Sequence, residues 1–402
     1  MTVELRPLGV ACNLGCTYCY QEPMREAKNI NTKYDIELML KIAEETGQVF
    51  SLFGGEILLL PKNDLEKFLK RSFELHGTSM LQTNGTLIDD DHIELFKKYK
   101  THVGVSIDGP NDLNGLRVVR AKKDDPTKTS EFTQKTIEGI RKIASNNIGC
   151  GIIITLHRLN GTKESLPRLL NFMRWLGDIG IKGGNIHTLE VDKTMPDQSK
   201  HVLTQEENAE AFIMIAEFLK ENPDLTYNPF RDIKDAISGS DENLNCTWKK
   251  CDPLNTQAVY GIEGDGGLSN CGRTNKEGID WYKADDSGFE RYISLYNTPQ
   301  EFGGCQGCRF FTICGGSCPG EAMDYDFRNK TIHCYTQKKI LGYYEEELEK
   351  EGKIPFSRRP DLKMIEKIMM DGLKDNNPRS FNSIAQEIKL GKGKHVQVVD
   401  VK

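Results

Sequence analysis

Three cysteines stand close together in the stretch GVACNLGCTYCYQEP, residues 9 to 23. Three and two residues separate Cys12, Cys16 and Cys19, so one loop can wrap three thiolates around a single metal centre. A [4Fe–4S] cluster normally takes four cysteines, and three would leave one iron free to bind a substrate or cofactor. A zinc site completed by histidine and a set of buried or redox thiols are the alternatives. Neither explains why no histidine or fourth cysteine lies nearby.

A second group of cysteines is larger. Of the twelve in the chain, eight crowd one segment: Cys246, Cys251, Cys271, Cys305, Cys308, Cys314, Cys318 and Cys334. Thiols of cytosolic proteins are kept reduced, so metal binding explains this clustering better than disulfides do. Eight thiols suffice for two four-cysteine [4Fe–4S] clusters, and two zinc knuckles are the competing interpretation. Cys150, in the apolar stretch IGCGIIIT, is expected to be a buried residue of a strand.

The composition is that of a soluble globular protein. The 402 residues are 38% hydrophobic and 28% charged, and the formal net charge of -6 gives no basic excess for a nucleic-acid partner. No run of ~20 apolar residues occurs, and the N-terminus MTVELRPLGV lacks the pattern of a signal peptide. We therefore expect a cytoplasmic protein with no membrane span.

Apolar and amphipathic runs alternate over residues 1–222, which predicts strand–helix units and a parallel sheet. Strands are expected at 3–8, 48–53, 78–83, 102–107, 149–156 and 183–189. Helices are expected at 35–46, 63–75, 89–99, 131–145, 162–177 and 205–220. The predicted fold class is α/β, a partial (β/α)6 TIM-like barrel with its chemistry at the carboxyl ends of the strands.

The pattern changes after residue 222. A bridge is expected at 223–245, a small Cys-rich domain that metal must hold together at 246–340, and a C-terminal helix and tail at 341–402. The stretch 353–402 holds 11 Lys+Arg against 6 Asp+Glu. We expect this basic tail to be a solvated surface segment, with docking of an acidic peptide as the alternative.

The cysteine triad, with Tyr18 just before its third member, resembles the radical S-adenosylmethionine (radical SAM) enzymes. The stretch FGGE, which ends at Glu56, follows a predicted strand where that family places its Gly-Gly-Glu motif. The resemblance implies that Gly54 and Gly55 permit close backbone approach. It also implies that Glu56 and exposed carbonyls accept hydrogen bonds from the methionine ammonium of SAM. The proline that usually follows in the family is isoleucine here.

Two further strand ends, LQTNG and VSIDGP, carry polar residues that family members use near the cofactor. The resemblance makes Asn84, Ser106 and Asp108 candidates for ribose and carboxylate contacts. Either Arg117 or Arg120 is the candidate for pairing with the methionine carboxylate. The implied chemistry is reductive cleavage of SAM at the open iron, which yields a 5′-deoxyadenosyl radical that abstracts a hydrogen from the substrate.

The order of the C-terminal cysteines resembles the SPASM domain of radical SAM enzymes that modify peptides and proteins. By this resemblance, auxiliary cluster I takes Cys246, Cys251, Cys271 and Cys318, and auxiliary cluster II takes Cys305, Cys308, Cys314 and Cys334. The implied cofactors are thus three [4Fe–4S] clusters and SAM. Full ligation of both auxiliary clusters favours electron transfer over direct capture of a substrate.

Two branches of the family compete for the function. The anaerobic sulfatase-maturing enzymes, which make formylglycine, carry an Asp after the third auxiliary cysteine as a base, whereas Gly272 and Arg273 follow Cys271 here. We therefore favour a peptide maturase that forms a thioether, carbon–carbon or carbon–oxygen cross-link in a ribosomally made precursor peptide. An iron–sulfur electron carrier is the alternative that is not an enzyme, but it would not need the cofactor-binding strand ends.

The sequence leaves the substrate and the catalytic base unassigned. His187, at the end of the sixth predicted strand, is a candidate for proton transfer, and a packing role is the alternative. With eleven residues before Cys12, a leader peptide would be recognised by the barrel mouth, residues 190–245, the basic tail or a partner chain. The expected partners are a peptide or protein substrate and a one-electron donor such as flavodoxin or ferredoxin.

Overall fold

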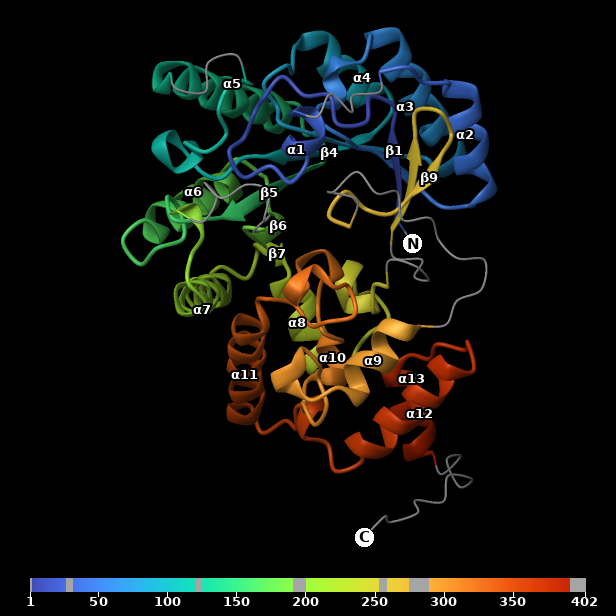
Figure 1. The fold of residues 1–402 in the computed structure, drawn as a ribbon. Coiled ribbons are helices and arrows are strands. Elements are labelled where there is room, and N and C mark those ends of the chain that lie inside the picture. The colour runs from blue at the N-terminus through green and yellow to red at the C-terminus, as the bar shows by residue number, and fades with distance from the viewer. Residues whose placement is uncertain are drawn as a thin grey trace. The chain divides into compact units, whose positions relative to one another are not determined.

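The computed structural model describes residues 2–26, 32–120, 125–190, 200–252, 259–274 and 289–390 (Figure 1). The chain divides into two compact units. The first comprises Met1–Phe230 and Val259–Lys283, and the second comprises Arg231–Ala258 and Ala284–Lys402. The chain therefore leaves the first unit, returns to it for a short segment that carries Cys271, and leaves it again.

The first unit is built on one nine-stranded sheet in the order β7-β6-β5-β4-β3-β2-β1-β8-β9. Its strands are β1 (Thr2–Arg6), β2 (Phe50–Leu52), β3 (Ser79–Thr83), β4 (Thr101–Ser106), β5 (Cys150–Leu156), β6 (Gly183–Thr188), β7 (Thr226–Asn228), β8 (Val259–Glu263) and β9 (Leu268–Ser269). All neighbours are parallel except β8 and β9, which form an antiparallel hairpin. The six predicted strands are β1 to β6, and the predicted α/β class with a partly open parallel sheet is confirmed.

Helices connect these strands and pack on the sheet (Figure 1). They are α1 (Glu22–Glu26), α2 (Ile36–Glu45), α3 (Lys62–His76), α4 (Asp90–Lys98), α5 (Pro126–Ser145), α6 (Leu166–Asp178) and α7 (Gln205–Glu221). Helix α5 begins five residues before the predicted start because Asp125 caps it, accepting hydrogen bonds from the amides of Thr127 and Lys128. Alternate strand residues such as Val103 and Val105 are fully buried and form the core under the helices.

The second unit is mainly helical. Its helices are α8 (Phe230–Ile237), α9 (Glu290–Asn297), α10 (Phe311–Cys314), α11 (Cys334–Lys350), α12 (Leu362–Lys374) and α13 (Phe381–Lys389). The expectation of a solvated tail is wrong for α12 and α13, because Ile365, Met369 and Ile384 are buried and the ring of Phe381 lies 4.5 Å from that of Phe356. The charged residues of this stretch lie on the opposite faces of amphipathic helices, which composition alone does not reveal. The last residues of the predicted tail, 391–402, lie outside the described residues.

Within the described parts of the chain, no helix is both long and apolar enough to cross a membrane.

Candidate active site

The carboxyl ends of the parallel strands bring most of the sequence-predicted site residues of the first unit to one edge of the sheet. The cysteine triad follows β1, the Gly-Gly-Glu stretch follows β2, and Asn84 follows β3. Ser106 ends β4, Asp108 follows it, and His187 lies in β6. Parallel neighbours end at the same edge, so this arrangement follows from the strand order.

The two glycines after β2 are required by the backbone of the cysteine loop. A Cβ on Gly55 would lie 2.0 Å from the carbonyl oxygen of Ala11, and one on Gly54, whose φ is +139°, would lie 2.6 Å from that of Gly9. The amide of Gly55 donates a hydrogen bond to Gly9 at 2.9 Å, and that of Glu56 donates one to Ala11 at 2.8 Å. The Gly-Gly-Glu stretch therefore holds the start of the cysteine loop through backbone contacts.

Glu56 joins the ends of two strands. Its side chain is buried, and its oxygens accept hydrogen bonds from the hydroxyl of Thr83 at 2.6 Å and from the amides of Asn84 at 2.7 Å and Leu58 at 3.0 Å. Burial raises the pKa of this carboxyl group, and the three hydrogen bonds act in the opposite direction. Because all three donors belong to the chain, Glu56 has a structural role in addition to its predicted contact with SAM.

The three cysteines of the loop influence one another electrostatically. Burial raises the pKa of Cys12 to about 11. It also raises that of Cys16, to which charges on Cys19 and Cys12 add, while Arg117 acts in the opposite direction. Thiols in such surroundings ionise when a metal binds them, and three thiols on one short loop fit a cluster with one open iron. In the part of the chain that the structure describes, no group of three His, Cys, Asp or Glu side chains could hold a single metal ion.

Asp108 forms the centre of a buried network. It is fully buried, and its oxygens accept hydrogen bonds from Nε and Nη2 of Arg117 at 2.9 and 3.0 Å and from the Tyr18 hydroxyl at 2.5 Å. The Thr155 amide donates a further bond of 2.9 Å, and Nε2 of His157 lies 3.5 Å away. Burial alone would raise the pKa of Asp108, but Arg117 and His157 hold it well below its usual range. Asp108 and Arg117 were both predicted site residues, but nothing in the sequence indicated that they pair with each other.

The second arginine of that stretch has another partner. Nη2 of Arg120 donates to Oε2 of Glu22 at 2.7 Å, and Nε of Arg25 donates to the same oxygen at 3.0 Å. Nη2 of Arg25 also donates a hydrogen bond of 2.8 Å to Sγ of Cys19. Neither Glu22 nor Arg25 was singled out from the sequence, although an acidic and a basic residue three apart on a short helix were a visible signal.

Asn84 ties the loop after β3 to the cysteine loop. Its Nδ2 donates to Oδ1 of Asn13 at 2.8 Å, and its Oδ1 accepts from the hydroxyl of Thr86 at 2.7 Å. Ser106 is nearly buried, and its hydroxyl accepts a hydrogen bond of 3.4 Å from Gln82. Both residues lie among polar groups, and Asn84 is adjacent to the cysteines through Asn13.

A second polar group surrounds the residue after Cys271. A Cβ on Gly272 would lie 2.8 Å from the hydroxyl oxygen and 2.9 Å from Cε2 of Tyr20. The next residue, Arg273, forms an ion pair of 2.5 Å with Glu190, which follows β6. Burial, followed by the charge of Arg273, lowers the pKa of His187 to about 3, so this histidine is neutral at physiological pH.

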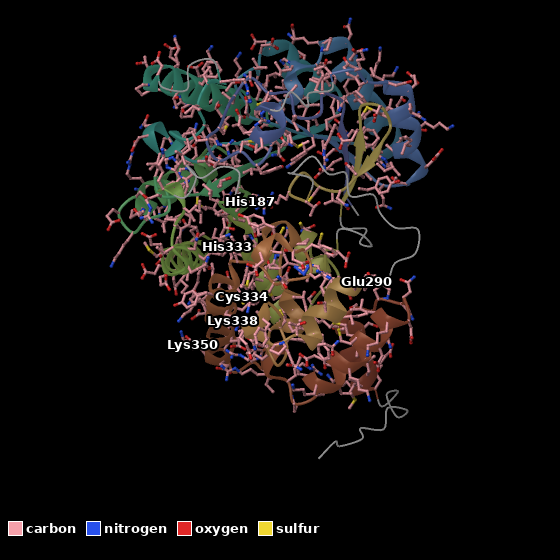
Figure 2. All side chains as sticks on the ribbon, in the orientation of Figure 1. His187, Glu290, His333, Cys334, Lys338 and Lys350 are labelled. Atoms are coloured by element: carbon pink, nitrogen blue, oxygen red, sulfur yellow. The ribbon has the colours of Figure 1, made fainter. Side chains whose placement is uncertain are left out.

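Four cysteines of the second unit line one small cavity: Cys305, Cys308, Cys314 and Cys334. Burial raises the pKa of Cys305 to about 12, and charges on Cys308 and Cys334 add to this shift. Phe310, Phe311 and Leu341 provide an apolar wall. Cys334 begins α11, and Lys338 lies one turn further along it and also lines the cavity (Figure 2). The donor set fits the four-iron cluster predicted for these cysteines.

The other predicted auxiliary ligands are divided between the units. Cys246, Cys251 and Cys318 belong to the second unit, and Cys271 belongs to the first. Their joint ligation of one cluster therefore stays a prediction. Cys150 was expected to be a buried strand residue. It begins β5 as predicted but is only partly buried, and burial raises its pKa to about 12.

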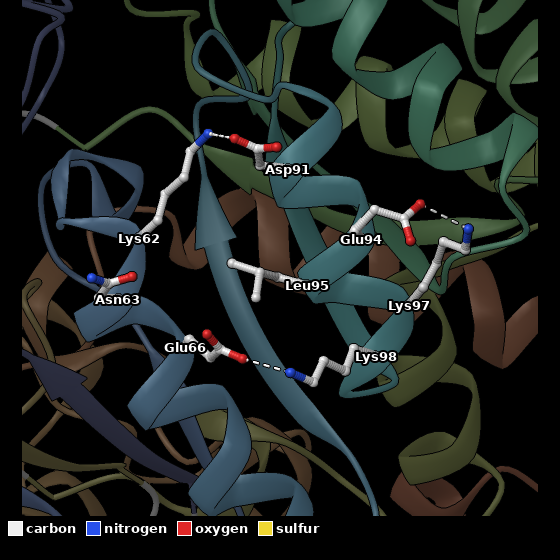
Figure 3. Close-up of a pocket in the computed structure, with 8 residues that line it drawn as sticks. All are labelled: Lys62, Asn63, Glu66, Asp91, Glu94, Leu95, Lys97 and Lys98. Carbon is white, nitrogen blue, oxygen red and sulfur yellow. Dashed lines mark hydrogen bonds and ion pairs between the residues drawn. The ribbon is translucent and has the colours of Figure 1, made fainter.

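A groove of about 720 Å³ between α3 and α4 contains none of these residues (Figure 3). Its lysines are paired with acidic groups: Lys62 with Asp91 at 2.6 Å, Lys98 with Glu66 at 2.7 Å and Lys97 with Glu94 at 2.9 Å. This balance of charge leaves the groove without a marked electrostatic preference.

A parallel sheet with a three-cysteine loop after its first strand and Gly-Gly-Glu after its second is the framework of a radical SAM domain. Residues 7–173 match the family model of the Radical SAM superfamily, so this part of the chain is a radical SAM domain, as the resemblance in its motifs implied.

The curated relatives match shorter stretches. The serine-type anaerobic sulfatase-maturating enzyme of Bacteroides thetaiotaomicron is 33% identical over 129 residues, which are 28% of this chain and 30% of that protein. The cysteine-type enzyme of Clostridium perfringens is 32% identical over 130 residues, 29% of this chain and 35% of that protein. The chain thus matches only about a third of the length of these two relatives.

Solved structures share the fold over most of the chain. The structure of anSMEcpe with bound AdoMet and the Cp18Cys peptide has a TM-score of 0.65 at 17% identity and covers 87% of this chain and 98% of that one. The structure of Streptococcus suis SuiB bound to the precursor peptide SuiA has a TM-score of 0.55 at 14% identity and covers 84% of this chain and 75% of that one. At these identities the likeness establishes the fold alone.

Proposed function

We propose that this protein is a radical SAM enzyme that oxidises a side chain of a peptide or protein. The observation that carries the proposal is the three-thiol loop held against Gly54 and Gly55, with Glu56, Asn84 and Asp108 at neighbouring strand ends. An iron–sulfur electron carrier would need cysteines, but it would not need these polar residues at the ends of neighbouring strands. The sulfatase-maturating relatives and the structures determined with peptides support a peptide or protein as the substrate.

The residues that would hold the cofactors are those of the loop and the strand ends. Cys12, Cys16 and Cys19 would bind one [4Fe–4S] cluster. When bound, this cluster and SAM supply the 5′-deoxyadenosyl radical that removes a hydrogen atom from the substrate. Glu56 would accept a hydrogen bond from the methionine ammonium, and Asn84 would keep the loop after β3 against the cysteine loop, as its bond to Asn13 does here.

The structure favours one of the two arginines for the methionine carboxylate. Arg117 uses Nε and Nη2 on Asp108, which is the same pair of donors that a bidentate carboxylate contact needs. Arg120 donates only Nη2 to Glu22, and its side chain is 33% exposed. We therefore propose Arg120 for the cofactor carboxylate, with Arg117 and Asp108 fixing the loop after β4 and the ring of Tyr18.

The second unit would hold the path for the surplus electron. Cys305, Cys308, Cys314 and Cys334 would bind auxiliary cluster II in the cavity that they line. Auxiliary cluster I would take the remaining four cysteines: Cys246, Cys251, Cys271 and Cys318. A substrate that loses a hydrogen atom and then a proton has one electron to dispose of, which a fully ligated cluster can accept. Flavodoxin or ferredoxin is the proposed partner for one-electron exchange.

For the product, we propose an oxidative cross-link between side chains of a precursor peptide. The close packing of Tyr20 against Gly272 supports this choice, because a side chain at that position would clash with the tyrosine ring. An aspartate base directly after Cys271 is thus absent from the sequence, and a side chain at that position would require Tyr20 to move. Formylglycine formation is the second candidate, which the likeness to sulfatase-maturating enzymes supports.

One experiment tests the proposal and separates the two products. The reconstituted protein is incubated anaerobically with SAM, dithionite and two peptides: a short precursor from a neighbouring gene, and a sulfatase peptide that contains the Cys or Ser to be oxidised. We expect 5′-deoxyadenosine and a loss of two hydrogens from the precursor. Formylglycine in the sulfatase peptide alone would support the second candidate. Absence of 5′-deoxyadenosine from a protein loaded with iron would refute both.

A further inference from the structure

A buried arginine ties the two ends of the cysteine loop together. Arg25, on α1, is 4% exposed. Its Nη2 donates a hydrogen bond of 2.8 Å to Sγ of Cys19, and its Nη1 donates one of 2.9 Å to the carbonyl oxygen of Val10. Val10 lies two residues before Cys12, and Cys19 is the last thiol of the loop. One rigid guanidinium group therefore fixes the distance between the start of the loop and its third thiol.

The arginine is itself held by a buried acid. The side chains of Arg25 and Glu22 are each 2% exposed, and Nε of Arg25 lies 3.0 Å from Oε2 of Glu22. Arg120 contacts the same carboxylate at 2.7 Å. Together, the two guanidinium groups and this one carboxylate carry one net positive charge. This charge is permanent, because a guanidinium group does not lose its proton in a protein.

We propose that Arg25 is a positioning residue that raises the reduction potential of the cluster on Cys12, Cys16 and Cys19. The inference rests on the proposed function, since it needs a cluster at this loop. Hydrogen bonds to the cluster sulfurs and nearby charge are among the determinants of iron–sulfur potentials. A donor and a positive charge stabilise the reduced state, which carries one more negative charge. Arg25 therefore makes the cluster easier for a weak physiological donor to reduce.

The test is a redox titration of the reconstituted protein, followed by electron paramagnetic resonance. The signal of the N-terminal cluster is assigned by its change when SAM is added. In Arg25→Met, which lacks both charge and donors, we expect the ratio of reduced to oxidised cluster at a fixed potential to fall about tenfold, a negative shift of about 59 mV for one electron. Signals that do not respond to SAM should keep their potentials in the same sample.

For a second variant we expect the reduction potential to shift in the opposite direction. Glu22→Gln removes the negative charge between Arg25 and Arg120 and should move the potential of the SAM-responsive signal upward. Arg71→Met is the matched control, because Arg71 on α3 forms a solvent-exposed ion pair with Glu44 and should leave every potential unchanged. A purely structural contact would not give opposite shifts in two variants of one ion pair.

The outcomes are separable. If Arg25→Met and Glu22→Gln load the N-terminal cluster and keep its original potential, the inference is overturned. If Arg25→Met fails to load that cluster, Arg25→Lys decides, since it keeps the charge but loses the fork: a smaller negative shift supports the inference, and an unchanged potential overturns it. If the unaltered protein loads no SAM-responsive cluster, the proposed function fails and not this inference alone.

Discussion

Replacing Gly55 with alanine should remove the N-terminal cluster while leaving the fold in place. The new Cβ would lie 2.0 Å from the carbonyl oxygen of Ala11 and 2.6 Å from that of Val10. Both contacts are to backbone, so no side chain can rotate away. The cysteine loop must move instead, and the hydrogen bonds from Gly55 to Gly9 and from Glu56 to Ala11 must stretch or break.

The magnitude follows from these contacts. Overpacking a tight site costs about 1–3 kcal/mol, and each lost hydrogen bond costs about 1 kcal/mol. The sum, about 3–5 kcal/mol, is smaller than the free energy of unfolding of a typical domain, which is about 5–15 kcal/mol. The loop is therefore expected to give way before the sheet does. Iron should fall from about twelve to about eight atoms per chain, since one of three four-iron clusters is lost.

The assay combines iron determination, urea unfolding and the yield of 5′-deoxyadenosine. The matched control is Gly342→Ala, because Gly342 lies in α11 and a Cβ there would have no atom within 4 Å. This control should keep all its iron and gain up to about 1 kcal/mol, as alanine restricts the unfolded chain. If Gly55→Ala retains the iron content and the 5′-deoxyadenosine yield of the unaltered protein, the steric reasoning is refuted.

Three further outcomes are expected. Asp108→Asn leaves the buried charge of Arg117 without its carboxylate, which should lower the free energy of unfolding by about 3–5 kcal/mol in urea titrations. Arg117 holds the pKa of Asp108 below its usual range, so the ionised carboxylate stabilises the folded state at pH values above about 3.9, the ordinary pKa of an aspartate. This stabilisation is lost as the pH falls towards the pKa of Asp108 in the folded state. Asp108→Asn should therefore show a weaker loss of stability in acid, and an equal acid dependence would contradict the assignment. Cys314→Ala should cost about four irons per chain while 5′-deoxyadenosine still forms, and loss of the SAM-responsive signal in this variant would argue against separate clusters. Arg120→Gln should raise the dissociation constant for SAM about tenfold in equilibrium dialysis with little change in urea unfolding, whereas equal affinity would return the carboxylate to Arg117.

Features that repeat along the chain or that have a fixed spacing could be predicted from the sequence. The alternation of apolar residues located β1 to β6, and the spacing of Cys12, Cys16 and Cys19 identified the loop that follows β1. The short strands β7 and β9, of three and two residues, were missed because such runs show no periodicity. Helices α12 and α13 were missed because their charge was given more weight than their apolar faces.

Contacts between distant residues were not visible in the sequence. Arg117 was one of two candidates for the methionine carboxylate, but its two donors are used by Asp108, and only the fold brings these two side chains into bidentate contact. Arg25 carried no motif, and its bond to Cys19 depends on the direction of α1 after the loop. At position 272 the sequence showed only that an aspartate base is absent. The structure adds that a Cβ there would lie 2.9 Å from Cε2 of Tyr20.

The pairing of β1 with β8 has a consequence for synthesis on the ribosome. Thr2 pairs with Val259 and Arg6 pairs with Glu263, so β1 is completed by a strand made more than 250 residues later. At about 5–20 residues per second, one edge of β1 lacks its partner for some tens of seconds after it leaves the ribosome. An unpaired strand edge is a template for aggregation. We therefore expect the nascent chain to depend on chaperones until β8 emerges.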